Sequence, residues 1–192
     1  MSLMRIVREL DAGPVADIER VAIGPLDTAE DLEGRLARAA VPLVSRALPR
    51  LGAGTLEFRG QDHAAATFCR RLAKTDGVLD FAAPARRLAA RVNGLHPWPS
   101  VTLEAGGLSL RAGQADAVGQ GREAAPGTVC GADESGLLVA TGDGLLRLRR
   151  LQRPGGKMLE ASAFLRGFPV AAGTVFGSAL MPALAGTAPF AR

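Results

Sequence analysis

One basic stretch, residues 145–157, constrains the fold more than any other part of the sequence. Leucines alternate there with Arg147 and Arg149, which is the period of a β-strand with one apolar and one cationic face. Arg150 breaks the alternation and indicates a bulge or the end of the strand. A Pro-Gly-Gly turn follows. The stretch therefore predicts a strand that places its leucines on a core.

The same stretch carries positive charge with no acid in it. Its basic residues are Arg147, Arg149, Arg150, Arg153 and Lys157. A sheet face with uncompensated positive charge suits a polyanion, and a solvated strand face is the alternative. The formal net charge of the chain is +4, and all but two of its basic residues are arginine, whose planar fork binds two phosphate oxygens.

Composition excludes several classes of protein. The chain has 192 residues, enough for one ordinary domain or two small ones, and its apolar runs are too short to span a bilayer. Cys69 and Cys130 are the only cysteines, so neither a disulfide scaffold nor a zinc site is expected. We expect both thiols to be buried, and the compartment to be a reducing cytoplasm.

The first third of the chain predicts strands followed by a long helix. Residues 4–10 read as the end of a strand or its exit and residues 15–23 as another strand, separated by an Asp-Ala-Gly-Pro turn. Apolar residues then recur at helical spacing from Leu32 to Ala47. Pro42 lies within this helix and is expected to kink or divide it.

A second helix is predicted just after residue 80, with Asp80 as its N-cap and Pro84 in its first turn. A Pro-Trp-Pro sequence ends it, and Trp98 is expected to anchor the core rather than to stack on a base. His96 is expected to seat the helix against the sheet. The apolar stripe of the helix consists of Ala85, Leu88, Val92 and Leu95.

Short strands separated by glycine-rich turns follow, a pattern typical of a small barrel or sandwich. A short helix is predicted at 161–166, residues 173–176 are expected to close the barrel, and the end of the chain is expected to be a mobile tail. The predicted strands are 101–104, 108–112, 128–132, 136–140 and 145–151.

Several segments together resemble the methionyl-tRNA formyltransferase family in their order and spacing. They are Glu9–Val15, Gln61–Asp80, His96–Pro99, Thr141–Gly144, Leu151–Met158 and Phe164–Gly167. The resemblance implies an α+β, mostly β chain: a C-terminal OB-like β-barrel with a preceding helix, and a remnant of a Rossmann-like α/β formyltransferase core. The expected parts are 1–54 for the core remnant, 55–75 for the linker, 76–178 for the barrel and 179–192 for the tail.

The resemblance also implies an activity, the transfer of a formyl group from formyl-tetrahydrofolate to the amino group of methionyl-initiator-tRNA. In that family an Asn-x-His motif and an aspartate form the catalytic set. Asp11 matches the aspartate, and the loop of Asp11, Ala12, Gly13 and Pro14 matches a wall of the folate site. The sequence contains no Asn-x-His, since Asn93 is its only asparagine.

We therefore expect a C-terminal fragment, preceded by a short leader at Met1–Leu3, that is inactive alone, binds no cofactor or metal, and contributes tRNA binding. If the resemblance holds, the basic residues are expected to contact tRNA phosphates. They are Arg70, Arg71, Lys74, Arg86, Arg87, Arg91, Arg147, Arg149, Arg150, Arg153 and Lys157. Self-association through the exposed core remnant is a further expectation.

Two alternatives stay open. One is a stand-alone RNA-binding barrel without a catalytic parent. The other is a related formyltransferase that acts on a different amine, such as an amino-sugar nucleotide.

Overall fold

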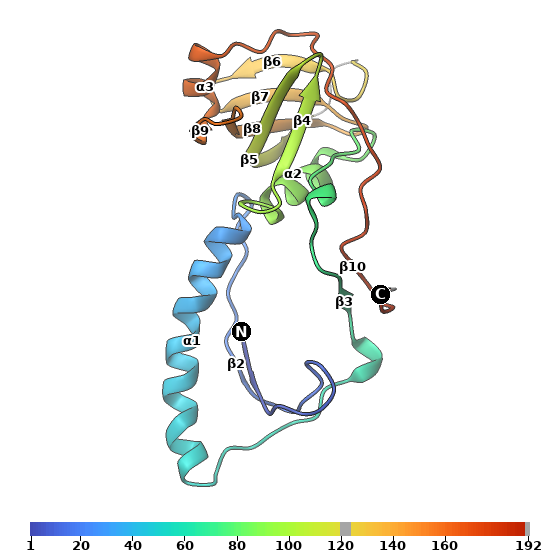
Figure 1. The fold of residues 1–192 in the computed structure, drawn as a ribbon. Helices are drawn as coiled ribbons and strands as arrows, with labels where there is room; N and C mark the ends of the chain where they lie inside the picture. Colours follow the sequence, from blue (N-terminus) through green and yellow to red (C-terminus); the bar gives the residue numbers. More distant parts are fainter. Residues whose placement is uncertain (120–123, 191–192) are drawn as a thin grey trace. The chain divides into compact units, whose positions relative to one another are not determined.

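The computed structural model describes residues 1–119 and 124–190, and the chain divides into two compact units (Figure 1). The first unit comprises Met1–Gly24, Asp31–Arg70 and the segment from Leu184 onward. The second comprises Pro25–Glu30 and Arg71–Ala183. The strands of both units pair mostly antiparallel. Together with the helices, they give a mixed fold.

The first unit is built on a short hairpin and a long helix. Strand β1 (Ser2–Met4) pairs antiparallel with β2 (Val15–Ile18), so the expected leader residues take part in a strand. Residues 5–10 follow the end of β1, as the exit of a strand does, whereas residues 19–23 lie outside β2 and the strand predicted there is shorter than expected. Helix α1 (Ala29–Gly52) continues past Pro42 to Gly52, so the proline does not divide it.

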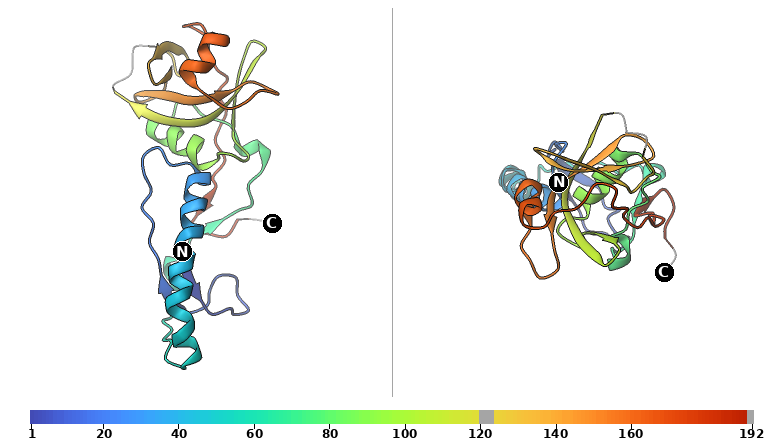
Figure 2. Two further views of the ribbon diagram at one scale, coloured as in Figure 1. Left: turned by 90° about the vertical axis from the view of Figure 1, so that its left-hand side faces the viewer. Right: turned by 90° about the horizontal axis from the view of Figure 1, so that it is seen from above.

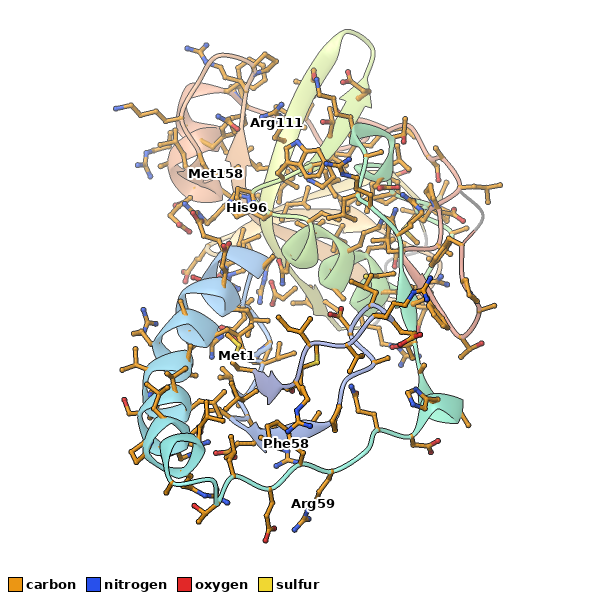
Figure 3. All side chains as sticks on the ribbon, turned by 60° about the horizontal axis from the view of Figure 1, so that its bottom comes forward. Met1, Phe58, Arg59, His96, Arg111 and Met158 are labelled. Atoms are coloured by element: carbon orange, nitrogen blue, oxygen red, sulfur yellow. The ribbon has the colours of Figure 1, made fainter. Side chains whose placement is uncertain are left out.

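The remainder of the first unit ties distant segments together. The guanidinium of Arg5 lies 4.3 Å from the ring centre of Phe58, one of the residues labelled in Figure 3. A short 3₁₀ turn, η1 (His63–Ala65), precedes β3 (Phe68–Cys69), which pairs antiparallel with β10 (Ala185–Gly186). Part of the expected mobile tail is therefore held in a strand pair.

The second unit contains one six-stranded antiparallel sheet. Its order is β4-β5-β8-β7-β6, with β9 added beside β8. The predicted strands are confirmed, although β5 extends six residues beyond its predicted end at residue 112. The strands are β4 (Val101–Ala105), β5 (Leu108–Val118), β6 (Val129–Asp133), β7 (Gly136–Ala140), β8 (Leu145–Gln152) and β9 (Leu159–Glu160).

The sheet does not close on itself by strand pairing, since β4 and β6 are its two ends. The segment expected to close it, residues 173–176, forms backbone hydrogen bonds near both ends. The N–H of Gly173 donates to Val129 O at 2.8 Å, and the N–H of Gly177 donates to Glu104 O at 2.8 Å. A single chain segment thus bonds to both outer strands.

Helix α2 (Ala85–Gly94) packs against β5 and β8 of this sheet, as Figure 2 shows from two further directions. The stripe predicted for it is buried throughout, which confirms the helical spacing. The N-cap, however, is Pro84 rather than Asp80. The Asp80 carboxylate instead accepts from the N–H of Ala82 within the preceding turn.

Three residues that were expected to be buried lie elsewhere. Trp98 is 54% exposed, so it does not anchor the core; Phe81 and Phe176, whose ring centres lie 6.4 Å apart, fill the interior instead. Cys69 is exposed and Cys130 is half-buried, which makes the expectation of two buried thiols wrong. Two further elements complete the unit, η2 (Lys74–Asp76) and α3 (Ala161–Gly167).

Candidate nucleic-acid interface

The Asp11–Pro14 turn of the first unit is held in place by hydrogen bonds from a distant side chain. Gln61 donates from its Nε2 to the carbonyl oxygens of Asp11, at 2.8 Å, and Gly13, at 2.7 Å. A side chain at Gly13 would place its Cβ 1.7 Å from Arg5 O, so only glycine fits. Asp11 itself is exposed and has a φ of 53°. The turn thus presents the Asp11 carboxylate outward on a fixed backbone.

Asp11 lies on a broad groove of about 1180 Å³ within the first unit. Arg59, labelled in Figure 3, and His63 line the same groove. Among the residues that the structure describes, no cluster of histidine, cysteine and acidic side chains suits a metal ion. The groove therefore offers one carboxylate of the expected catalytic set and no metal centre in its described part.

Arg147 on β8 is neutralised by acids from neighbouring strands. Its Nε donates to Asp116 Oδ1 on β5 at 3.0 Å, and its Nη1 donates to Asp133 Oδ2 at the end of β6 at 3.1 Å. Asp116 lies directly opposite Arg147 in the β5–β8 register, where opposite charges stabilise the pair. Arg149 shares the same carboxylate, with Nη1 3.3 Å from Asp116 Oδ1.

These contacts shift the ionisation of the groups involved. Hydrogen bonding to Asp116 is the main cause that raises the pKa of the Arg147 guanidinium above its ordinary value. Partial burial opposes ionisation of Asp133, but the N–H of Ser135 and the Arg147 guanidinium together outweigh it and hold its pKa below the ordinary range.

Arg150 follows the same pattern with a weaker partner. Its Nε lies 3.5 Å from Glu160 Oε1 on β9, without hydrogen-bond geometry. Three of the five cations in the basic stretch thus face acids, and the positive face inferred from the stretch alone is largely compensated.

Arg91 holds backbone carbonyls together. Its Nε and Nη2 donate to Asp76 O at 3.2 and 2.8 Å, and its Nη1 donates to Pro182 O at 3.2 Å. Its Nε also donates to Val78 O at 3.1 Å, and a guanidinium committed to three backbone carbonyls is poorly placed to bind phosphate. We therefore assign Arg91 a mainly structural position within the second unit.

The other residues of the second unit that were expected to contact phosphate are exposed. Arg86 and Arg87 are exposed on α2, and Arg153 and Lys157 are exposed in the loop after β8. Lys74 and Arg71 are exposed near η2, whereas Arg70 is half-buried and belongs to the first unit. The structure thus does not gather the expected phosphate contacts in one patch: it leaves exposed groups on α2, near η2 and on the β8–β9 loop.

The Thr141–Gly144 turn, another segment of the resemblance, contributes to the structure by positioning helix α2. Thr141 donates from its Oγ1 to Asp143 O at 2.9 Å and to Gly144 O at 2.7 Å. The carbonyl of Asp143 also accepts from the first N–H of α2, on Ala85, at 2.9 Å. The turn therefore fixes the start of the helix relative to β8.

Residues 71–169 match the model of the family described as formyl transferase, C-terminal domain. The chain belongs to this family. The match covers the described strands of the sheet together with α2 and α3, so the family assignment rests on the second unit.

Two curated relatives of this C-terminal formyl transferase chain carry the same name. Methionyl-tRNA formyltransferase of Burkholderia thailandensis is 38% identical over 177 residues, which cover 92% of this chain and 54% of that protein. The enzyme of the same name from Burkholderia multivorans is 39% identical over 178 residues, with 92% and 54% covered. The chain thus spans about half the length of the curated relatives it matches.

Solved structures share the fold at lower identity. HypX from Aquifex aeolicus, in complex with tetrahydrofolic acid, has a TM-score of 0.62 at 16% identity and covers 85% of this chain and 29% of HypX. The N-formyltransferase from Helicobacter canadensis, in complex with folinic acid and dTDP-3-aminofucose, has a TM-score of 0.59 at 15% identity, with 76% and 52% covered.

In the described part of our chain, none of the helices has the length and apolar character that crossing a membrane requires.

Proposed function

We propose that this chain is part of a methionyl-tRNA formyltransferase, which transfers a formyl group from formyl-tetrahydrofolate to the amino group of methionyl-initiator-tRNA. The observation that carries the proposal is identity of 38% across 92% of the chain to proteins of that name. Translation initiation in the cytoplasm is the setting that this activity implies.

Asp11 is the residue of this chain that we assign to the reaction. Formyl transfer needs a deprotonated amine aimed at the formyl carbon and donors for the oxyanion that forms. A carboxylate on a fixed turn suits the orientation of a partner base, and the loop of Ala12, Gly13 and Pro14 suits a wall for the folate. The Asn-x-His partners are absent from the sequence, so the chain alone is expected to be inactive and to hold no folate.

The second unit supplies the RNA contact. We assign it an OB-like barrel, in which residues 173–177 complete the gap between β4 and β6; their hydrogen bonds to Val129 and Glu104 support this assignment. Its exposed cations Arg86, Arg87, Arg153 and Lys157 are the phosphate contacts best supported by their exposure. We also propose the domain boundaries expected from the sequence: 1–54 for the core remnant, 55–75 for the linker, 76–178 for the barrel and 179–192 for the tail.

An amino-sugar substrate is the second candidate. The Helicobacter canadensis neighbour is complexed with dTDP-3-aminofucose, but at 15% identity the likeness shows the fold alone. The curated relatives and the exposed cations favour tRNA. Self-association of the first unit remains a prediction, which sedimentation equilibrium of the purified chain checks.

Two assays on the purified chain test the proposal. Fluorescence anisotropy with labelled initiator tRNA is expected to show binding that weakens steeply as salt rises. A formylation assay with methionyl-tRNA and formyl-tetrahydrofolate is expected to show no turnover until the Asn-x-His half of a relative is supplied. Turnover by the chain alone would contradict the inferred division of the active site, and absence of tRNA binding at low salt would contradict the RNA role.

A further inference from the structure

A pocket of about 360 Å³ lies between the loop after β8 and helix α3, and no step of formyl transfer involves it. Its volume is at the lower end of the range for small-molecule sites, roughly 300–1,000 Å³, which suits a ligand about as large as one nucleotide. Apolar groups from Leu159, Phe164 and Phe168 line one part, and Arg153 and Lys157 line another. The pocket therefore joins an apolar wall to two cations.

The aromatic wall is held in place by a ring pair. Phe164 is buried, and its ring centre lies 5.5 Å from that of Phe168 with an angle of 60° between the planes. This edge-to-face packing is favourable for aromatic rings and fixes the half-buried Phe168 against a rigid neighbour. Phe168 thus presents an ordered apolar surface at the pocket.

The two cations differ from those on β8. Arg147, Arg149 and Arg150 each face a carboxylate. Arg153 and Lys157 are exposed, and no acid of the described chain forms an ion pair with either. The uncompensated charge of the basic stretch is therefore located at this pocket, where an anion meets no competing carboxylate from the described residues.

The loop that carries these cations is fixed by contacts at both ends. Gln152 donates from its Nε2 to Gly156 O at 2.6 Å, and the N–H of Gly156 donates to Arg153 O at 3.0 Å. Met158, labelled in Figure 3, packs so closely on Gly113 of β5 that a Cβ there would lie 2.6 Å from its sulfur. A preformed loop loses little entropy on binding.

We propose that this pocket binds one unpaired nucleotide of an RNA, with the base against Phe168 and the adjoining phosphate between Arg153 and Lys157. Base–aromatic contact together with a cationic site is the usual means by which proteins hold single-stranded RNA. The proposal rests on the RNA-binding function proposed above and adds to it a contact that duplex RNA cannot make. An acidic peptide is the competing ligand that the same chemistry admits.

Binding of two short RNAs by the full chain tests the proposal. One is a single-stranded hexanucleotide that contains 2-aminopurine, and the other is a duplex of similar charge. The wild type is expected to bind the single strand more tightly and to change its 2-aminopurine fluorescence. Phe168→Leu keeps an apolar side chain and is expected to lose about 10-fold in single-strand affinity, with duplex affinity unchanged.

Matched variants separate the two parts of the pocket. Lys157→Gln is expected to weaken the binding of both RNAs and to reduce its salt dependence, whereas Arg38→Gln, at an exposed position of α1, is expected to leave the fluorescence change intact. Circular dichroism and thermal melting establish that each variant is folded. Equal affinity for both RNAs with no fluorescence change, or tighter binding of a polyglutamate peptide than of the hexanucleotide, would overturn the pocket assignment.

Initiator tRNA distinguishes the failure of this inference from the failure of the proposed function. If the wild type binds tRNA and Phe168→Leu binds it equally, with no hexanucleotide response, the pocket assignment alone is wrong. If the wild type binds the hexanucleotide but no tRNA, the pocket is supported and the tRNA function is contradicted.

Discussion

Asn93 on α2 forms two hydrogen bonds with the backbone of Ala115 on β5. Its Nδ2 donates to Ala115 O at 2.9 Å, and the N–H of Ala115 donates to its Oδ1 at 2.8 Å. Strand β4 pairs with β5 only as far as Ala112, so a buried side chain from the helix supplies a donor and an acceptor where that pairing has ended. The only asparagine of the chain thus joins the helix to the sheet.

Replacing Asn93 with leucine is expected to destabilise the second unit strongly. The variant leaves two buried backbone groups of Ala115 without partners, each of which costs about 1–3 kcal/mol, so we expect a loss of about 2–6 kcal/mol in the free energy of unfolding. Urea denaturation followed by circular dichroism measures it. The exposed Arg87→Gln on the same helix is the control, with a change expected within about 0.5 kcal/mol. A similar small change for Asn93→Leu would show that water replaces the lost partners.

The Arg147–Asp133 contact predicts a dependence of stability on acid. The folded-state pKa of Asp133 is depressed, so the carboxylate contributes stability that is present above its unfolded pKa, about 3.9, and is lost as the pH falls through the folded value. Arg147→Gln is expected to reduce stability near neutral pH by about 1 kcal/mol for each ion pair that it removes and to flatten the fall below about pH 4.

Thermal melting from neutral pH to about pH 2 compares wild type with that variant. Arg153→Gln removes the same charge from the neighbouring loop without touching a described carboxylate, so its acid profile should follow the wild type. Identical profiles for wild type and Arg147→Gln would mean that the contact does not shift the ionisation of Asp133.

Removing the Asp116 carboxylate is expected to strengthen RNA binding. Asp116→Asn leaves Arg147 and Arg149 with less compensating charge, which should raise tRNA affinity a few-fold at low salt and steepen its salt dependence. Anisotropy titrations at several salt concentrations measure both quantities. Glu134→Gln, in the exposed β6–β7 turn, removes one negative charge that forms no ion pair with a described arginine, and is the matched control. Equal gains in the two variants would assign the effect to net charge alone.

The local sequence pattern predicted most of the helices and strands of the second unit, but not the polar contacts between them. The alternation of leucine and arginine in 145–149 and the helical stripe of Leu88 and Val92 depend on burial of one face, which a sequence records at short range. Neutralisation of Arg147 depends on Asp116, 31 residues away, and follows only from the strand register. The same limit explains Arg91, whose acceptors Asp76 and Pro182 come from distant segments.

Residue type alone also misplaced single side chains. Tryptophan often anchors a core, but Trp98 lies between two prolines at the end of α2 and is turned outward. The pocket at Phe168 was missed because its aromatic pair and its cations are separated in sequence by β9. The spacing of Phe164 and Phe168, four residues apart at a short helix, was the available signal.

Gly142 carries the last prediction, because a side chain there has no space. Its ideal Cβ would lie 1.9 Å from Ala82 O and 2.7 Å from the Ala82 carbonyl carbon. The facing backbone has little freedom to move: the N–H of Gly142 donates to Phe81 O at 2.8 Å, and the Phe81 side chain is fully buried. Gly142→Ala is therefore expected to lower the free energy of unfolding by about 1–3 kcal/mol, or to displace the turn that positions α2.

Gly94→Ala is the matched control for this substitution. Nothing lies within 4 Å of a Cβ built at Gly94, and the residue is the last of α2, so alanine is expected to leave stability unchanged or raise it slightly. Urea denaturation of both variants gives the comparison, and amide hydrogen exchange of α2 reports whether the turn has moved. If the two alanine variants unfold at the same urea concentration, the close approach of Gly142 to Ala82 has no energetic consequence and the helix start must be fixed by Thr141 and Asp143 alone.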